Sequence, residues 1–335
     1  MKAINSNYCL ILHKTTILKQ GTVIKSTGSW YKVIDADGKH WDCRIRGKLR
    51  LAGIKSTNPI AVGDEIEFDI EQTKDDEEQT GVIKKILPRK NYVIRKSINL
   101  SKRSHILAAN IDCVYLIVTL VSPQTQTGFI DRFLVTAEAY HIPVTLLFNK
   151  IDLYTAAELE QLDSMKLIYE NAGYRCLTIS AKQASSVEFL KAEIKGKKVM
   201  FGGHSGVGKS TLVNTLDQNL SLKTAQISKS HSSGLHTTTF AEMFELATGG
   251  FIIDTPGIRA FGLIDFDKKE LSHYFPEMRD LLPDCKFNNC QHIKEPKCAI
   301  QQAFIEDRIA ESRYLNYVKM MEEDEDETFR KDIYK

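Results

Sequence analysis

Hydrophobic and polar positions follow three different patterns along the chain. Between about residues 21 and 94, short β-rich segments such as GTVIKST, HWDCRIRG and DEIEFDI alternate with turn signals, among them Asp37-Gly38 and Val62-Gly63-Asp64. About five short strands at this spacing predict a small barrel of the OB type.

Apolar runs and helical stretches alternate after the polar join RKSINLSKRSH. The apolar runs are IDCVYLIVTL, IPVTLLF, YRCLTIS and KKVMFGG, and the helical stretches are FIDRFLVTAEAY, AAELEQLDSMKLIYENAG and SVEFLKAEIK. This alternation predicts a parallel α/β sheet.

The last part of the chain, from about residue 265, predicts short helices around a cysteine cluster, followed by one helix over residues 304–323. We therefore expect three domains, over residues 1–95, 96–264 and 265–335. The first is the OB-type barrel, the second the α/β domain, and the third a small α-helical domain built around the cysteines.

The composition is that of a soluble globular protein. The chain has 335 residues, of which 42% are hydrophobic and 26% charged. No apolar run approaches the roughly 20 residues of a membrane span, and the apolar stretch near the N-terminus is too short for a signal peptide. These features predict a cytoplasmic protein that does not bind membranes.

The net charge of the chain is +2, but positive charge is concentrated in the N-terminal part, because residues 1–55 hold 11 Lys or Arg against three Asp. A basic OB-type barrel favours RNA as a partner, and its aromatic residues Trp30, Tyr31 and Trp41 are candidates for stacking on bases. The alternative is that these aromatic side chains form the barrel core. The basic residues that support RNA binding include Arg44, Arg46, Lys48 and Arg50. The acidic run from Glu322 to Glu327 is interpreted as a solvated tail.

A phosphate-binding loop lies between the strand KKVMF and the helical TLVNTLD. It matches the pattern G-x-x-x-x-G-K-[ST], in which the glycines turn backbone N–H groups toward phosphates and the helix N-terminus adds partial positive charge. The lysine is expected to reach the β- and γ-phosphates and the serine to ligate Mg²⁺. The nucleotide-binding residues predicted here are Gly203, His204, Ser205, Gly206, Val207, Gly208, Lys209, Ser210 and Thr211.

The segment FNKID selects guanine over adenine in this prediction. Asp152 would accept hydrogen bonds from guanine N1 and N2, Asn149 would contact the purine edge, and the Lys150 stem would lie along the ring. A second loop after the strand RCLTI would bring a backbone N–H to guanine O6, and the carboxyl ends of parallel strands are where ligands bind in such sheets. The residues predicted to bind guanine are Asn149, Lys150, Ile151, Asp152, Ser180, Ala181 and Lys182.

Two switch segments complete the pattern of a GTPase. After the strand GGFIID, Asp254 is placed to hold Mg²⁺ through water and the Gly257 N–H to contact the γ-phosphate. Residues 221–239 are polar and lack periodicity, as expected of a segment that the γ-phosphate and Mg²⁺ order, although a passive surface loop is the alternative. Within the triplet Thr237 to Thr239, Thr238 is the predicted Mg²⁺ ligand.

The motifs occur in the order base reader, second base loop, phosphate loop and switches, which is a circular permutation of the usual GTPase order. Permutation is tolerated because the termini of a compact domain usually lie close together at the surface. With WDCRIRGKLR, VGDEIEF, HTTT, DTPGIRAFGL and the cysteine cluster, the chain resembles the ribosome small-subunit-dependent GTPase A family (RsgA, also called YjeQ) over nearly its whole length. The resemblance implies an N-terminal OB-type β-barrel, a central circularly permuted P-loop GTPase domain and a C-terminal zinc-binding domain.

The resemblance also implies a function. It suggests a monomer that binds the small (30S) ribosomal subunit and its rRNA, acts in late subunit maturation, and hydrolyses GTP to GDP when the subunit activates it. Many GTPases orient the attacking water with a Gln after the switch II glycine, a position that Ile258 occupies here. His236 is the catalytic candidate, because an imidazole can position water near neutral pH and the resemblance assigns the same role. The alternative is a loop histidine without a chemical role.

A metal site is predicted from the spacing C-x₄-C-x-H-x₅-C. Three thiolates and one imidazole suit a closed tetrahedral site, so the prediction is one structural Zn²⁺, beside the Mg²⁺ that accompanies GTP. The other cysteines are scattered, which argues against a disulfide framework. The predicted zinc ligands are Cys285, Cys290, His292 and Cys298.

Two other functions stay open at this point. An RNA-bound scaffold whose nucleotide is mainly a structural ligand is favoured by the missing Gln and disfavoured by the complete switch elements. A P-loop ATPase or kinase is disfavoured by the segment NKID.

Overall fold

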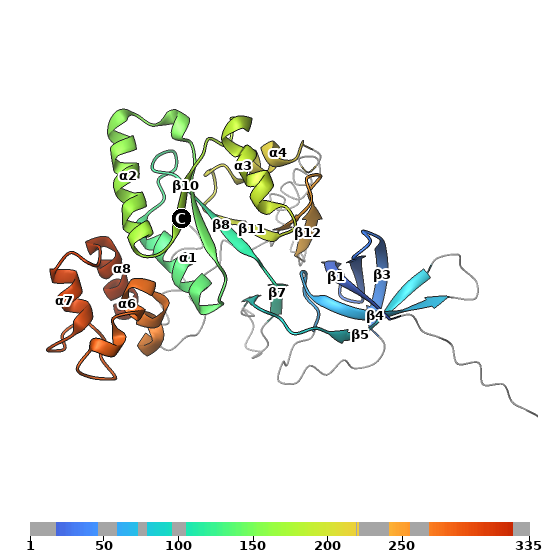
Figure 1. Cartoon of the computed structure of the whole chain (residues 1–335), viewed down its shortest axis with the longest axis horizontal. Coiled ribbons are helices and arrows are strands. Elements are labelled where there is room, and N and C mark those ends of the chain that lie inside the picture. Colours follow the sequence, from blue (N-terminus) through green and yellow to red (C-terminus); the bar gives the residue numbers. More distant parts are fainter. Residues whose placement is uncertain are drawn as a thin grey trace, which may run out of the picture.

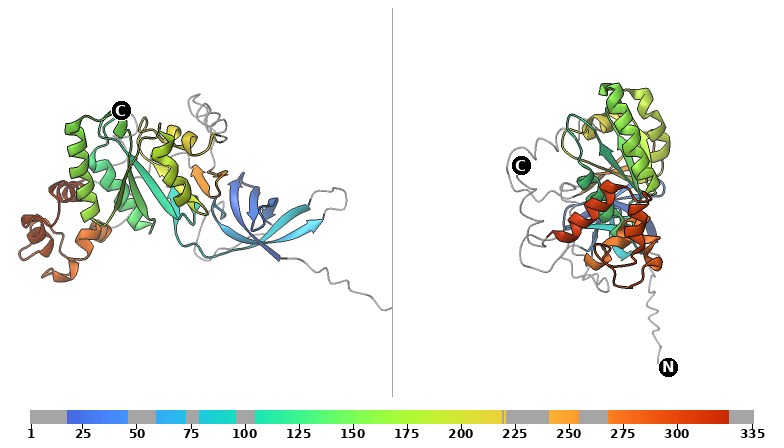
Figure 2. Two further views of the ribbon diagram at one scale, coloured as in Figure 1. Left: turned by 45° about the horizontal axis from the view of Figure 1, so that its top comes forward. Right: turned by 90° about the vertical axis from the view of Figure 1, so that its left-hand side faces the viewer.

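The computed structural model describes residues 18–45, 59–72, 79–95, 105–218, 220, 241–254 and 268–323. These residues form a barrel, an α/β domain and a helical C-terminal region, with the barrel and the C-terminal region at opposite ends of the α/β domain (Figure 1). The left view of Figure 2 shows the same arrangement, and the right view looks along the long axis, with the C-terminal region in front of the barrel. The domain boundaries expected after residues 95 and 264 adjoin or fall within segments outside the described ranges, and they stay predictions.

The N-terminal part is a closed five-stranded barrel. The strand order is β1-β2-β3-β5-β4, and the additional pairing of β1 with β4 closes the barrel. All pairs are antiparallel except β3 with β5. This confirms the predicted OB-type barrel. The strands are β1 (Leu18–Ser26), β2 (Trp30–Asp35), β3 (His40–Ile45), β4 (Glu65–Gln72) and β5 (Gln79–Ile86).

The aromatic residues of the barrel divide between core and surface. Tyr31 and Trp41 are 1% and 4% exposed and pack in the barrel core with Phe68, whereas Trp30 is 42% exposed. The alternation of strand side chains between the two faces explains why Trp30 and Tyr31, adjacent in sequence, have opposite environments. The alternative prediction, that these side chains form the barrel core, is therefore confirmed for Tyr31 and Trp41. Of the three aromatic residues, Trp30 alone has a ring available for stacking.

The central part is a six-stranded sheet in the order β10-β9-β8-β11-β13-β12. All neighbours are parallel except β12 and β13, which are antiparallel, so the predicted parallel α/β sheet is confirmed. Its elements are β8 (Cys113–Val118), α1 (Thr127–Ala139), β9 (Val144–Phe148), the 3₁₀ turn η1 (Ile151–Leu153), α2 (Ala156–Asn171), β10 (Arg175–Thr178), α3 (Ala184–Ile194), β11 (Lys198–Gly202), α4 (Lys209–Leu216), β12 (Glu242–Glu245) and β13 (Phe251–Asp254).

Helices cover both faces of this sheet. In β8, Val114 and Leu116 pack in one core with side chains of α1 and α2, while Tyr115 and Ile117 pack in a second core with side chains of α3 and α4. A strand buried on both faces needs apolar side chains at consecutive positions, which explains the unbroken apolar runs in the sequence.

The strands of the barrel and of the central sheet form one continuous hydrogen-bonded sheet. Strand β1 pairs antiparallel with β12 at Lys25 and Glu242, whose side chains form an ion pair at 2.9 Å. Lys198, the first residue of β11, pairs with Glu65 of the barrel. The barrel therefore contacts the amino end of β11, and the phosphate-loop motif follows the opposite, carboxyl end. A hairpin of β6 (Tyr92–Arg95) and β7 (His105–Ala109) forms a separate small sheet.

The C-terminal region is helical, and the second part of the helix predicted over residues 304–323 is confirmed, whereas its continuity is wrong, because the chain turns between two helices. The N–H of Arg308 donates to the carbonyl of Ala303 at 2.9 Å, the N–H of Asp307 donates to that of Phe304 at 3.1 Å, and Asp307 has φ +57°. This is a Schellman-type helix end, built without the glycine that would have marked it in the sequence. The elements are η3 (Lys268–Tyr274), α6 (Pro276–Arg279), η4 (Leu282–Asp284), α7 (Ala299–Ile305) and α8 (Glu311–Glu322).

Helix α1 joins the C-terminal region to the sheet. Its Phe133 packs in the sheet core and its Val135 in the core of the C-terminal region. At this contact the Arg313 guanidinium of α8 donates to the Asp131 carboxylate of α1 at 2.7 Å. Within the described residues, no helix is long and apolar enough to cross a membrane.

Candidate functional site

Four loops meet where the parallel strands of the sheet end. Residues 119–126 follow β8, residues 149–155 follow β9, residues 180–183 follow β10, and residues 203–208 follow β11. Because these strands are parallel neighbours, their carboxyl ends lie along one edge of the sheet, where α/β proteins bind ligands.

The phosphate-loop motif forms a turn between β11 and α4. Gly208, with φ +104°, precedes Lys209, the first residue of α4. A Cβ atom at Gly208 would lie 2.4 Å from Nδ2 of Asn149, so the close approach of the two loops requires glycine at this position. The ammonium of Lys209 donates to the carbonyls of Gly203 at 2.6 Å and His204 at 2.5 Å, so its charge lies over the loop.

Helix α1 lies against the start of this loop. The rings of His204 and Phe129 lie against each other with their centroids 3.7 Å apart and their planes tilted by 32°. A Cβ atom at Gly202 would lie 2.7 Å from the Phe133 ring. The His204 side chain therefore contacts α1, and its predicted role in nucleotide binding stays a prediction.

Asn149 connects three of the four loops. Its backbone N–H donates to Val118 at the end of β8 at 2.9 Å. Its side-chain Nδ2 donates to the carbonyl of Val207 at 2.8 Å, and its Oδ1 accepts from the N–H of Ala181 at 2.8 Å. The structure thus brings the predicted base reader, second base loop and phosphate loop together at one buried side chain.

Lys150 makes a further connection between the loops. It has φ +68°, and its ammonium donates to the carbonyl of Gly206 at 2.7 Å and to that of Ser122. Beyond this turn, Asp152 lies in η1 with its side chain exposed, and its contact with guanine stays a prediction.

Sequence reasoning missed the loop of residues 119–126 and Tyr154. The loop packs on itself through Thr119, whose hydroxyl donates to the carbonyl of Pro123 at 2.5 Å, and Pro123 lies beside Gly206. The Tyr154 hydroxyl bonds to both the base-reader loop and this loop. The segment TLVSPQTQT carries turn residues but no nucleotide motif, so no signal in the sequence pointed to this contact.

Several predicted site residues fall outside the described residues. These are His236, Thr238 and Gly257, and for Asp254 only the backbone, at the end of β13, is described. Lys182, Ser210 and Thr211 are exposed at the edge that holds the four loops. The predicted roles of all these residues stay predictions.

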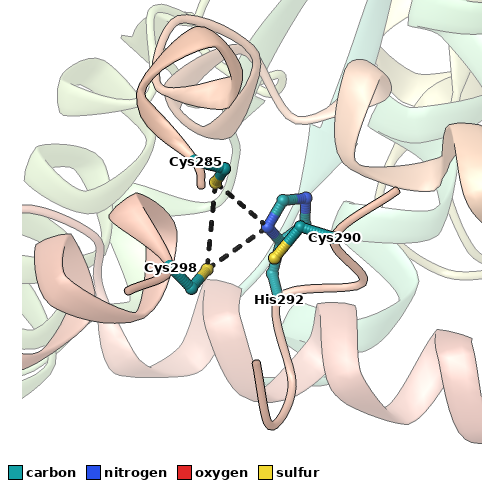
Figure 3. Close-up of side chains that lie close together, drawn as sticks. All are labelled: Cys285, Cys290, His292 and Cys298. Atoms are coloured by element: carbon teal, nitrogen blue, oxygen red, sulfur yellow. Dashed lines mark hydrogen bonds between the residues drawn. The ribbon is translucent and has the colours of Figure 1, made fainter. Parts of the chain in front are cut away.

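The second site is a cluster of three cysteines and one histidine in the C-terminal region. The side chains of Cys285, Cys290, His292 and Cys298 converge, and their ligand atoms all lie within 4.8 Å of one another (Figure 3). Nδ1 of His292 lies 3.3 Å from Sγ of Cys298 and 3.6 Å from Sγ of Cys285, and these two sulfur atoms are 4.0 Å apart. A tetrahedral zinc site has ligand–ligand distances of about 3.5 to 3.8 Å, so the cluster has the size and donor set for one ion.

Burial shifts the pKa values of two residues of this cluster in opposite directions. Burial lowers the pKa of His292, which favours the neutral imidazole that metals bind. Burial raises the pKa of Cys290 to about 12, a shift that a bound cation would reverse by stabilising the thiolate.

Two tyrosines of helix α8 form hydrogen bonds with the backbone of the cysteine–histidine cluster. The Tyr314 hydroxyl donates to the carbonyl of His292 at 2.7 Å, and the Tyr317 hydroxyl donates to that of Gln291 at 2.9 Å. His292 has φ +60°, and these two hydrogen bonds hold its backbone in that uncommon conformation.

Comparison with known proteins decides the family. The sequence model of the RsgA GTPase family matches residues 86–264, and the sequence model of the RsgA N-terminal domain family matches residues 20–83. The chain belongs to the RsgA GTPase family.

Similar family members cover almost all of the chain. A protein of Christiangramia forsetii named small ribosomal subunit biogenesis GTPase RsgA is 56% identical over 94% of this chain and 99% of its own length. Proteins of the same name from Flavobacterium psychrophilum and Bacteroides fragilis are 54% and 51% identical over 94% and 93% of this chain, and over 95% and 99% of their own lengths.

Two solved structures show the RsgA architecture. YjeQ from Thermotoga maritima matches with a TM-score of 0.72 and 36% identity over 91% of this chain and 98% of that protein. YloQ, described as a circularly permuted GTPase, matches with a TM-score of 0.71 and 28% identity over 92% of this chain and 96% of that protein. The predicted RsgA resemblance and the circularly permuted GTPase fold are therefore confirmed.

Proposed function

We propose that this protein is a GTP hydrolase that binds the small (30S) ribosomal subunit, acts in its late maturation, and is released after hydrolysis. The observation that carries the proposal is the junction at Asn149, which unites a phosphate loop and two base loops at one edge of the sheet. The names of its relatives, small ribosomal subunit biogenesis GTPases, supply the biological setting.

The chemistry divides among the predicted residues. Asp152 would accept hydrogen bonds from guanine N1 and N2, and Lys209 would neutralise the phosphates. Ser210, Thr238 and Asp254 would hold the Mg²⁺ that accompanies GTP, and this ion would offset the negative charge of the phosphates. His236 orients the attacking water in place of the Gln that many GTPases use. In this proposal the 30S subunit contacts the site and so stimulates hydrolysis.

The barrel would bind the RNA of the subunit, and the C-terminal region would hold a metal ion. The barrel carries the exposed Trp30, with the Arg44 guanidinium 5.9 Å from its ring centroid, a pairing suited to an unpaired RNA base. The cysteine cluster holds one structural Zn²⁺, because four protein ligands leave no open position for chemistry. We propose a cytoplasmic monomer.

The test is GTP hydrolysis by the purified protein, alone and with purified small ribosomal subunits, at low and high salt. We expect a slow basal rate that rises by about 10²-fold or more with subunits, as when a partner completes a GTPase site. Stimulation should weaken at high salt, because phosphate contacts release counterions. Lys209→Ala should lose both rates, whereas His236→Ala should lose the stimulated rate and keep GTP binding.

The outcomes separate the competing functions. Tight GTP binding without stimulation by subunits would favour an RNA-bound scaffold whose nucleotide is a structural ligand. Equal binding of ATP and GTP would refute the guanine site and favour a P-loop ATPase.

A further inference from the structure

The hydroxyl of Tyr154 links two loops of the nucleotide site. It accepts a hydrogen bond from the backbone N–H of Leu120 at 2.9 Å and donates one to the carbonyl of Asn149 at 2.7 Å. Tyr154 follows η1 directly and therefore lies two residues after Asp152. One hydroxyl thus ties the loop of residues 119–126 to both ends of the base-reader loop.

Both partners of this hydroxyl are buried and depend on it. Asn149 and Leu120 are almost inaccessible to solvent, so water cannot easily replace a lost partner. Burial also raises the pKa of Tyr154, so the hydroxyl keeps the proton that it donates. The ring packs at the margin of the core that contains the side chains of α1 and α2, which fixes the position of the oxygen.

The carbonyl of Asn149 belongs to the peptide that leads into Lys150. Lys150 has φ +68°, a left-handed conformation that a lysine adopts only when its surroundings impose it. Holding this carbonyl therefore holds the turn that directs Asp152 toward the base. The Lys150 ammonium, which donates to Ser122, braces the same turn on the same loop.

We propose that Tyr154 is a positioning residue for guanine recognition, which holds the base-reader turn against the loop of residues 119–126. The proposal rests on the guanine-binding role proposed above for Asp152. It assigns to residues 119–126, which carry no nucleotide motif, the role of a support for base selection.

The test is the substitution Tyr154→Phe, which removes the hydroxyl and keeps the ring. The matched control is Tyr31→Phe in the barrel, since Tyr31 is also buried and its hydroxyl also donates to a backbone carbonyl, that of Gly28 at 3.3 Å. Dissociation constants for GDP, IDP and ADP are measured by displacement of a fluorescent GDP, and the thermal midpoint of each variant is recorded.

We expect graded losses in Tyr154→Phe. GDP should bind about 5- to 50-fold more weakly, as when a buried hydrogen-bond partner is removed. The affinity for IDP, which lacks the N2 amine, should fall less, and the affinity for ADP, which offers no proton at N1, should fall least. The subunit-stimulated rate at saturating GTP should stay unchanged while KM rises, because the phosphates and the attacking water lie away from Tyr154.

A purely structural role of Tyr154 would give a different result. Equal losses for the three nucleotides, or a lower thermal midpoint with unchanged GDP affinity as in Tyr31→Phe, would overturn the proposal. If the unmodified protein itself failed to prefer GDP over ADP, the guanine site would be refuted instead. The two failures are therefore distinguishable.

Discussion

The contact between α1 and the C-terminal region contains a fully buried arginine whose removal should be costly. The Arg313 guanidinium donates to Asp131 at 2.7 Å and to both oxygens of Glu277 at 2.7 and 3.0 Å. Arg313 and Asp131 are 1% and 0% exposed. The substitution Arg313→Met keeps much of the side-chain volume but leaves two carboxylates without a cation.

The magnitude follows from the burial of these charges. Removing one partner of a buried ion pair costs about 3 to 5 kcal/mol, because the remaining charge stays without compensation. With an unfolding entropy of about 2.1 cal/mol/K per residue, this loss corresponds to a fall in the thermal midpoint of roughly 4 to 7 °C for a chain of 335 residues. The C-terminal region should detach from α1 first, since Arg313 joins these two parts.

The loss should depend on pH. Burial raises the pKa of Asp131, and the Arg313 guanidinium and the Asn316 amide oppose this rise. A carboxyl whose pKa is raised in the folded state binds more protons folded than unfolded, so stability falls as the pH rises through that pKa. Without Arg313 the pKa of Asp131 rises further, so the deficit of the variant should be larger at about pH 8 than at about pH 5.

The assay is urea unfolding followed by circular dichroism at both pH values, with limited proteolysis to detect release of the C-terminal region. The matched control is Arg308→Met, which removes an exposed ion pair with Glu306 in the same region and should cost only about 0 to 1 kcal/mol. Adding Asp131→Asn to Arg313→Met should restore part of the loss. Equal costs for the Arg313 and Arg308 variants would refute the reasoning.

Two further predictions concern the sites themselves. Gly208→Ala should weaken GDP binding about 10- to 100-fold, because the new methyl group would lie 2.4 Å from Nδ2 of Asn149 and the backbone has φ +104°. The control is Gly173→Ala, where φ is +93° and the space around the residue is open. This control should leave the GDP affinity, measured by titration, unchanged. Cys298→Ser, or treatment with a chelator, should abolish the zinc content measured by atomic absorption and expose the C-terminal region to protease. The control Cys113→Ser should keep the metal. Retention of zinc by Cys298→Ser would contradict the predicted set of ligands.

The local features of this protein were readable from its sequence. The five barrel strands, the alternation of strands and helices, the phosphate loop and the C-x₄-C-x-H-x₅-C spacing all arise from residues close together along the chain. The order of the motifs identified the circular permutation, because a permutation changes the connections and leaves each motif intact. Backbone propensity and side-chain alternation act over a few residues, which is why these predictions succeeded.

The features that join distant segments were decided only by the tertiary structure. The turn that follows α7, with Asp307 at φ +57°, carries no glycine signal, and the helix stops before it because the buried Ile309 and the following α8 pack in the C-terminal core. The pairing of Arg313 with Asp131 joins residues 182 positions apart, and Tyr154 reaches a loop 34 positions away. Such contacts depend on which surfaces the fold brings together, so the residue types alone did not specify them. The sequence therefore determined the motifs and their order, and packing determined how the loops and domains support one another.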